Sequence, residues 1–283
     1  MPILLTGASG FLGRHLVQLL REQGRAFTAC YFNHEPSFPA VRLPLSGREA
    51  ALGQIAALQP TAILHLAAVS SPNWCELYPA DSKAINADAP VFLAAYCREA
   101  RIPYLFASTD LVFDGLHAPY DEGWAPSPIC TYGRHKAEAE QGALLAYPET
   151  VITRLPLLYG WGGLLLNWVA EMRKGLPVSA FVDEFRTPAY VRDVAAGLLL
   201  LLRHNTPGIY HLGGHETYSR YEMGRAIAVA FGLDERLVQP CRQADVPMPA
   251  PRPADVSLSS EKAYALGYAP RLLKEALKMI NQH

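Results

Sequence analysis

The chain has 283 residues, of which 50% are hydrophobic and 18% are charged, and its formal net charge is −1. This composition provides for a sizeable core and excludes wholesale disorder. The near-neutral charge gives no electrostatic footprint for nucleic acid or for a membrane surface, so we expect a small molecule as the ligand.

The cysteines and the N-terminal residues favour a cytoplasmic protein. The five cysteines are scattered and form no CxxC pair, so neither a disulfide framework nor a thiolate zinc site is predicted. Residues 1–7 are typical of a first strand rather than a signal peptide, because no charged segment precedes the apolar stretch. The longest apolar run, Val194–Leu202, is too short to span a bilayer. We therefore expect reduced thiols in a cytoplasmic enzyme.

The first half of the chain alternates short apolar runs with helical stretches. Strands are predicted at Ile3–Leu5, Ala26–Phe32, Ala62–Leu66, Tyr104–Ala107 and Val151–Arg154. Helices are predicted at residues 11–23, 48–58, 80–100 and 130–147. The run Ala62–Leu66 does not alternate, which fits a strand buried on both faces. This alternation of elements implies βαβ units and predicts an α/β fold with a Rossmann-type, doubly wound parallel sheet.

The alternation loosens after Pro156. Helical stretches are predicted near Asn167–Lys174, Arg192–Arg203, Tyr218–Phe231, Ser259–Leu266 and Arg271–Asn281. The proline-rich stretch Pro240–Pro253 is typical of an extended loop, and Asp193 is expected to cap the helix that follows Val191. We predict that residues 1–155 form an NAD(P)-binding domain. For residues 156–283 we predict mainly a smaller C-terminal substrate-binding lobe, with some segments returning to the sheet.

A glycine-rich loop, Thr6-Gly7-Ala8-Ser9-Gly10-Phe11-Leu12-Gly13, lies between the first predicted strand and the first predicted helix. One glycine permits the tight turn, one lets the backbone approach a pyrophosphate, and one lets the helix pack close to the strand. The helix N-terminus then presents free N–H groups to the phosphates. An ordinary strand–turn–helix connection is the alternative, but the flanking elements are those that the motif requires. Dinucleotide contacts are therefore predicted for Gly7, Ser9, Gly10, Phe11, Leu12 and Gly13.

The end of the second strand bears on the choice of cofactor. In dinucleotide-binding folds, an acidic residue about 20 residues after the glycine loop binds the ribose diol of NAD. This chain has Asn33 and His34 there, and neither can replace that carboxylate. No arginine stands at this strand end to bind a 2′-phosphate. We predict that Asn33 and His34 line a site for NADPH, or for either NADP or NAD, rather than a site for NAD alone.

Tyr132 and Lys136 form a candidate catalytic pair. They are four residues apart on a predicted helix, which places them on one face, one turn apart. The pKa of a free tyrosine is about 10, and a nearby ammonium stabilises the tyrosinate and lowers that pKa. Such a pair often occurs by chance, but here Ser108 and Thr109 follow a strand at the sheet edge where ligands bind. A hydroxyl there can hydrogen-bond a carbonyl oxygen as charge develops on it, or it can merely end the strand.

Taken together, the TGxxGxxG loop, the Ser/Thr pair after a strand and the YxxxK pair resemble the extended short-chain dehydrogenase/reductase family. Within that family, the chain most resembles the dTDP-4-dehydrorhamnose reductase group, over nearly its whole length. The segments that carry the resemblance are residues 65–68 (HLAA), 108–115 (STDLVFDG), 183–188 (DEFRTP) and 252–258 (RPADVSL).

The resemblance implies reduction of a 4-keto nucleotide sugar by NADPH or NADH. Tyr132 would donate the proton to the carbonyl oxygen while the nicotinamide delivers hydride. Lys136 would hold the nicotinamide ribose, and Thr109 would position the carbonyl, with Ser108 as the second candidate. Cofactor contacts are also implied for Leu66, Ala67, Ala68, Ser108, Tyr132, Lys136 and Pro156. Substrate contacts are implied for Ser70, Asn86, Val112, Phe113 and Arg186.

The sequence departs from the pattern of the group at three places. Residues 72–76 read Pro-Asn-Trp-Cys-Glu where the reductases usually have Val-Asp-Lys/Arg-Ala/Cys-Glu, and Leu157 replaces a tryptophan that some of them carry. The segment at residues 72–76 borders the active site of the group, so its departure leaves the identity of the sugar open. Arg14 and His15 occupy the region of the acidic residue found in metal-linked dimers of the group, so we predict no bound metal.

Two other functions and one assembly also follow from the resemblance. The chain could be an NAD-dependent sugar epimerase or another carbonyl reductase of the same family. It could also be a non-catalytic NAD(P)-binding regulatory subunit, like the β subunit of methionine adenosyltransferase, although its retention of Tyr132 and Lys136 argues for an enzyme. Small apolar residues in the helices at residues 80–100 and 130–147 predict a homodimer, because related enzymes pair these helices across a two-fold axis.

Overall fold

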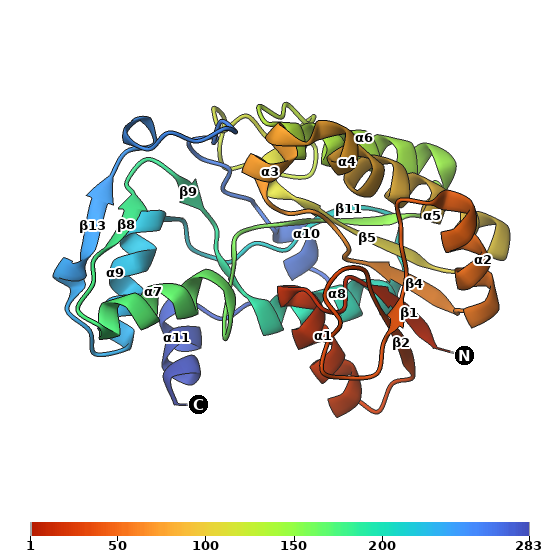
Figure 1. The fold of residues 1–283 in the computed structure, drawn as a ribbon, viewed down its shortest axis with the longest axis horizontal. Helices are drawn as coiled ribbons and strands as arrows, with labels where there is room; N and C mark the ends of the chain where they lie inside the picture. The colour runs from red at the N-terminus through yellow and green to blue at the C-terminus, as the bar shows by residue number, and fades with distance from the viewer. Residues whose placement is uncertain (1, 283) are drawn as a thin grey trace.

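A seven-stranded parallel sheet forms the centre of the computed structural model, which describes residues 2–282 (Figure 1). In spatial order the strands are β11 (Gly208–His211), β6 (Val151–Leu155), β5 (Tyr104–Thr109), β4 (Ala62–His65), β1 (Ile3–Thr6), β2 (Phe27–Tyr31) and β3 (Val41–Arg42). The strand order reverses between β1 and β4, and their carboxyl ends open a crevice there. The predicted Rossmann-type, doubly wound sheet is confirmed.

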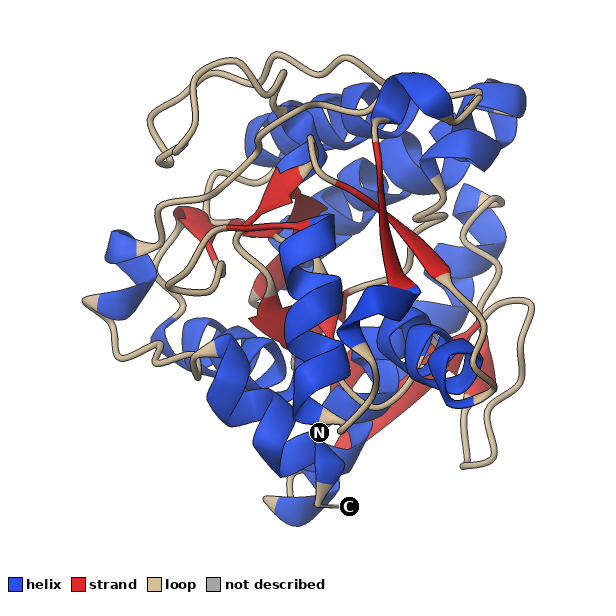
Figure 2. Cartoon of the chain, turned by 90° about the vertical axis from the view of Figure 1, so that its left-hand side faces the viewer, coloured by secondary structure: helices blue, strands red, loops and turns tan. Residues whose placement is uncertain are grey.

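Helices cover both faces of the sheet, so every residue of β1, β4 and β5 is buried. On one face α1 (Phe11–Glu22) packs against α8 (Val191–His204), and on the other α5 (Ala89–Ala100) packs against α6 (Thr131–Ala146) and α2 (Arg48–Leu58). Successive strand residues point to opposite faces, so Ile3 and Leu5 join the core under α1 and α8, whereas Leu4 joins the core under α2 and α5. Figure 2 shows the strands enclosed by the helices.

The helix predicted at residues 80–100 is unbroken over residues 79–100, but it contains a π-helical turn. The chain forms α3 (Pro72–Leu77), α4 (Pro79–Lys83), a π-helical turn over Ala84–Asp88, and then α5. Pro90 lacks an N–H group, so it cannot bond the carbonyl of Asn86 four residues earlier, and the wider turn accommodates that loss. Pro79 begins α4, where a missing N–H costs nothing.

The second half of the chain builds a smaller lobe beside the sheet, on the left of Figure 1. Its main elements are α7 (Gly163–Arg173), β8 (Val178–Phe181), α9 (Arg220–Ala230), β13 (Val238–Cys241) and α11 (Leu273–Asn281). Shorter ones are β7 (Leu158–Tyr159), β9 (Phe185–Arg186), β10 (Ala189–Tyr190), β12 (Tyr218–Ser219) and α10 (Glu261–Tyr264). Turns of 3-10 helix cover Asp110–Val112, Glu235–Leu237 and Gln243–Asp245. This half also supplies β11 and α8, so some of its segments do return to the sheet.

Three local predictions for this lobe need correction. The proline-rich stretch is not all loop, because its first residues belong to β13, which pairs in parallel with β8. The helix predicted from Tyr218 begins at Arg220, and Ser219 caps it in a capping box with Glu222. Asp193 does not cap α8: it lies inside the first turn and accepts a hydrogen bond from the Arg271 backbone N–H at 2.8 Å.

Candidate active site

A cavity of about 890 Å³ lies at the carboxyl ends of β1, β4, β5 and β6, and the smaller lobe closes its far side. Gly7 and Tyr132 line it on the sheet side, and Trp168, Arg220 and Arg252 line it on the lobe side. Its size and its position at the point where the strand order reverses suit a dinucleotide together with a second ligand.

The glycine loop forms a cradle that no side chain could share. Gly7 has φ +70°, and a Cβ atom there would lie 2.7 Å from the backbone nitrogen of Ala67. A Cβ atom on Gly13 would collide with the carbonyl oxygen of Gly7. The loop therefore runs close to the end of β4 and to α1, and it fits a pyrophosphate at the α1 N-terminus. The predicted loop contacts all line the cavity: Gly7, Ser9, Gly10, Phe11, Leu12 and Gly13.

The segment after β4 forms the adjoining wall. The hydroxyl oxygen of Thr6 accepts a hydrogen bond from the backbone N–H of Ala67 at 3.2 Å, which ties this segment to the end of β1. Thr6 is tied in turn to the buried His65 ring, 2.7 Å from its Nδ1. The predicted residues of this wall, and Pro156 opposite, line the cavity: Leu66, Ala67, Ala68, Ser70 and Pro156.

One residue near the end of β2, the exposed Arg42, lies outside the cavity lining and was not predicted from the sequence. Asn33 and His34 line the cavity as predicted. Arg42 on β3 lies beside them, because β3 pairs with β2 and aligns Arg42 with Tyr31. Its Nε donates to the carbonyl oxygen of Phe32 at 3.3 Å, and its guanidinium lies 5.8 Å from the Phe32 ring centre. No arginine stands at the end of the second strand itself, and only strand pairing brings Arg42 there.

Tyr132 and Thr109 meet at the centre of the cavity wall. Thr109 is the last residue of β5, Tyr132 lies in the first turn of α6, and both line the cavity. Burial raises the pKa of Tyr132 above its usual value; the nearby Cys75 and Asp110 act in the same direction, and a hydrogen bond with Thr109 opposes them. In this arrangement Tyr132 keeps its phenolic proton and is not a tyrosinate, which suits a proton donor.

Lys136 lies one turn after Tyr132, but behind the cavity wall. Its Nζ donates to the carbonyl oxygen of Ala107 at 2.5 Å and lies 4.0 Å from the Phe106 ring centre. Burial lowers the pKa of Lys136 to about 7, against the attraction of Glu140. The expected lowering of the tyrosine pKa by this ammonium is not seen, because burial dominates at Tyr132 and the ammonium is directed at Ala107.

The hydroxyl of Ser108 already donates its hydrogen within the protein. Its hydroxyl donates to Glu140 Oε1 at 2.5 Å, and Glu140 forms a buried ion pair with Arg154 at 2.7 Å. Although Ser108 lines the cavity, its only proton is therefore engaged by a carboxylate. This favours Thr109 over Ser108 as the hydroxyl that faces a substrate.

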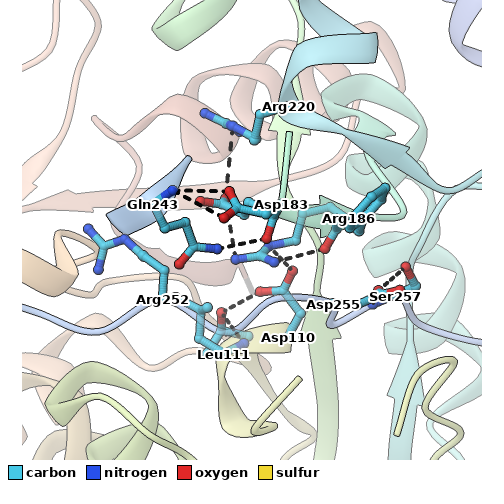
Figure 3. Close-up of polar contacts among 12 residues, drawn as sticks. Asp110, Leu111, Asp183, Arg186, Arg220, Gln243, Arg252, Asp255 and Ser257 are labelled. Atoms are coloured by element: carbon cyan, nitrogen blue, oxygen red, sulfur yellow. Dashed lines mark hydrogen bonds and ion pairs between the residues drawn. The ribbon is translucent and has the colours of Figure 1, made fainter. Parts of the chain in front are cut away.

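Three arginines from the second half line the cavity with Tyr132 and Thr109: Arg186, Arg220 and Arg252. In Figure 3, Arg186 lies between Asp110 below it and Arg220 above it. Arg186 Nε is 3.3 Å from Asp110 Oδ2, and its Nη2 is 3.4 Å from Glu184 Oε1. The three arginines outnumber the two neighbouring carboxylates, Asp110 and Glu184, so this wall has a net positive charge. Arg252 donates to Asn73 at 2.9 Å, and its Nη1 has no hydrogen-bond partner among residues 2–282.

Only Arg186 of these arginines was a predicted substrate contact. Arg252 belongs to the segment RPADVSL, which could have pointed to it, whereas Arg220 at the start of α9 carries no motif.

The other predicted substrate contacts except Ser70 do not line the cavity. Asn86 is completely buried, and its amide exchanges two hydrogen bonds of 3.0 Å with the backbone of Val69. Val112 and Phe113 are also completely buried, and Phe113 stacks on Tyr120 with 4.1 Å between ring centres. These residues hold the loops that carry the site rather than the substrate itself.

A glycine cradle at the crevice of a doubly wound sheet, with a YxxxK helix beside it, defines an NAD(P)-binding oxidoreductase of the extended short-chain dehydrogenase/reductase type. The chain belongs to the family described as RmlD substrate binding domain, whose model matches residues 1–283.

Similar proteins include enzymes and a regulatory subunit. The probable low-salt glycan biosynthesis reductase Agl14 of Haloferax volcanii is 33% identical over 263 residues, covering 89% of this chain and 88% of that protein. The methionine adenosyltransferase 2 subunit beta of Xenopus tropicalis is 31% identical, covering 95% of this chain and 83% of that protein.

Solved structures agree with the fold over the whole chain. A dTDP-4-dehydrorhamnose reductase of Clostridium acetobutylicum superposes with a TM-score of 0.91 at 26% identity, covering 100% of this chain and 99% of that one. A UDP-glucose 4-epimerase of Thermus thermophilus, in complex with NAD, gives a TM-score of 0.86 at 26% identity, covering 100% and 98%.

Proposed function

We propose that this protein reduces the 4-keto group of a nucleotide-linked sugar with NADPH or NADH. The observation that carries the proposal is a single cavity that joins a dinucleotide cradle, the Tyr132–Thr109 pair and an arginine-rich wall. Arginines bind phosphate oxygens through paired N–H groups, so a diphosphate linking nucleoside and sugar suits Arg220 and Arg252. The sugar would then lie between that wall and Tyr132, with Ser70 and Arg186 at its edges.

When bound, the nicotinamide would supply the hydride for the carbonyl carbon. Tyr132 would donate its phenolic proton to the carbonyl oxygen as negative charge grows there, and Thr109 would hold that oxygen in place. Lys136, behind the end of β5, would steady the nicotinamide ribose side of the site. The partition of the chain into a cofactor-binding part at residues 1–155 and a mainly substrate-binding part after it fits these roles.

The preference for NADPH is part of the proposal. Asn33, His34 and Arg42 replace the carboxylate that would select NAD, and a guanidinium at this place can pair with a 2′-phosphate.

A cofactor-oxidation screen tests the function. Purified protein with NADPH is offered 4-keto nucleotide sugars with different nucleotides, and simple ketones, while the loss of NADPH absorbance is recorded. Tyr132→Phe should lower turnover by about 10²–10⁴-fold, because it removes the proton source, and it should leave NADPH binding nearly intact. Lys136→Ala should weaken both turnover and cofactor binding, and Thr109→Val should lower turnover less than Tyr132→Phe. Tyr78→Phe, at an exposed tyrosine outside the cavity, is the matched control.

The same screen separates the alternatives. Interconversion of sugars without net cofactor oxidation would indicate an epimerase. The likeness to a regulatory β subunit favours a second candidate, a cofactor-binding subunit without turnover. Tight NADPH binding with no ketone reduced, and with Tyr132→Phe indistinguishable from the wild type, would support that candidate against the reductase.

The assembly and the compartment belong to the same proposal. A homodimer through α5 and α6 is supported by Leu145, which α6 leaves 75% exposed, but Ala87, Ala94 and Ala143 pack within the chain. Light scattering that gives a 31.0 kDa particle at every concentration would count against the dimer.

No helix within residues 2–282 combines the length and the apolar character needed to cross a membrane. The cytoplasm suits the five cysteines, none of which is in a disulfide in the described chain.

A further inference from the structure

The hydroxyl of Thr109 has three hydrogen-bond partners within reach, and its single hydrogen can be donated to only one of them. The backbone N–H of Leu111 donates to it at 3.2 Å, Asp110 Oδ1 lies 3.1 Å away as an acceptor, and Tyr132 forms a hydrogen bond with it as well. A hydroxyl has one hydrogen and two acceptor positions. Because Leu111 occupies one acceptor position, the hydrogen can point to Asp110 or to the Tyr132 side, but not to both.

The surroundings of Asp110 allow its carboxyl group to be either ionised or protonated. Its side chain is buried, and its Oδ2 accepts no hydrogen bond within residues 2–282. The charged groups that face it are Arg186 on β9 at 3.3 Å, Glu184 just before β9, and Arg220 on α9. Burial raises the pKa of Asp110 to about 6, against the attraction of Arg186 and the hydrogen bond from Thr109, while Glu184 acts with burial.

We propose that Asp110 sets the direction of the Thr109 hydrogen bond, and so acts as a positioning residue for the reduction proposed above, on which this inference rests. When Asp110 is ionised, Thr109 donates to the carboxylate and its free acceptor position draws the Tyr132 hydroxyl away from the substrate. When Asp110 has taken up a proton from solvent, its O–H donates to Thr109. Both acceptor positions of Thr109 are then filled, and its own hydrogen turns toward Tyr132 and the substrate oxygen.

The second arrangement favours the reaction. As the Tyr132 proton moves to the carbonyl oxygen, a tyrosinate is left behind, and a hydrogen bond donated by Thr109 stabilises the negative charge on the Tyr132 oxygen. A phosphate group bound on Arg220 would weaken the attraction between that arginine and the Asp110 carboxylate, and so favour the neutral acid. Binding of an anionic substrate would therefore turn Thr109 toward the reacting atoms.

The first test is the pH profile of kcat, which reports groups in the substrate complex. In the wild type, kcat should fall by about tenfold as the pH rises through the Asp110 titration, as expected for the loss of one hydrogen bond. Asp110→Asn, whose amide can donate to Thr109 at every pH, should remove this step and keep the low-pH value. Glu184→Gln removes an equal charge beside Arg186 without touching Thr109, so it should keep the step, displaced to lower pH.

Two outcomes of this test would overturn the proposal. One is an Asp110→Asn variant that keeps the wild-type step. The other is a variant with normal circular dichroism and NADPH binding that is inactive at every pH, because Asp110 would then be needed as a charge.

The second test needs no substrate. In pH-difference infrared spectra, the carboxylic-acid band that Asp110→Asn lacks reports the protonation of Asp110. Thr109→Val should move its midpoint upward by about one pH unit, because the carboxylate loses a hydrogen-bond donor. Thr153→Val, at a buried threonine whose hydroxyl bonds Phe106 instead, should leave the midpoint unchanged. Inorganic pyrophosphate should raise the midpoint in the wild type.

These readouts separate the two proposals. An unchanged midpoint in Thr109→Val would overturn the inference even in an active reductase. A shifted midpoint in a protein that reduces no ketone would count against the reductase and still support the hydrogen-bond coupling.

Discussion

The guanidinium of Arg42 stands at the end of β2, where the adenosine ribose of a bound dinucleotide would lie. A 2′-phosphate there would gain a charge-assisted hydrogen bond that a free ribose hydroxyl could not form. Arg42→Ala should therefore weaken NADPH binding by about tenfold and NADH binding by less than about twofold. Fluorescence titration of both cofactors measures the two constants.

Arg98→Ala, an exposed arginine on α5, serves as the control for the general loss of a positive charge. An equal loss of affinity for both cofactors would mean that Arg42 shapes the strand end rather than binding a phosphate.

At the scale of single residues, the sequence was most informative where spacing fixes geometry. The interval between Tyr132 and Lys136 follows from local periodicity. The same is true of the place of Thr109 at the carboxyl end of a strand, although the strand extends two residues further than predicted and includes Thr109. The sequence could not show that Ser108 is engaged by Glu140, 32 residues away, or that Lys136 donates to Ala107 behind the cavity. Such contacts depend on how a helix lies across a strand.

At the scale of elements, the π-helical turn over Ala84–Asp88 fixes the wall after β4 through Asn86. Its amide both donates to and accepts from the Val69 backbone. Asn86→Ala leaves these buried groups unpaired, so it should lower the free energy of unfolding by about 1–3 kcal/mol and weaken cofactor binding several-fold. Urea unfolding, NADPH titration and hydrogen exchange at Val69 measure these effects.

Asn167→Ala, at an exposed residue of α7, is the matched control. Unchanged exchange at Val69 in Asn86→Ala would show that the loop holds its place without this side chain.

The elements also show where the periodicity of the sequence no longer predicts the structure. The apolar pattern continues through residues 80–100, but Pro90 forces a wider turn that the pattern cannot register. Asp193 was expected at a helix end; the helix begins two residues earlier, and Asp193 meets Arg271, 78 residues away. The pairing of β8 with β13 joins Val178 to Val238, 60 residues later in the chain, and has no local signal either.

At the scale of the whole molecule, two buried histidines make stability depend on pH. Burial lowers the pKa of His65 to about 3, with Lys136 acting in the same direction, and burial followed by Arg154 lowers that of His211 to about 3. An unfolded histidine has a pKa of about 6.5, so between these values the unfolded chain binds more protons. The free energy of unfolding should therefore fall with decreasing pH, by up to about 1.4 kcal/mol per pH unit for each histidine.

Urea unfolding at pH 7 and pH 5 should show this loss, and His65→Gln should make it smaller. His204→Gln, at the exposed end of α8, should leave the slope as it is. A slope that His65→Gln does not change would place the acid sensitivity elsewhere.

The whole sheet was predictable in kind, because alternating strands and helices have few arrangements. Its last strand, β11, and the helix α8 come from the half of the chain that was assigned to the other lobe. Leu16 and Leu20 of α1 pack in the same core as Leu198 and Leu201 of α8. During synthesis on the ribosome, the glycine loop and the strands β1 to β6 would therefore emerge before α8, which packs against α1. Until α8 emerges, one face of the nascent sheet lacks a helix that packs on it in the finished protein, so the two halves of the chain depend on each other for folding.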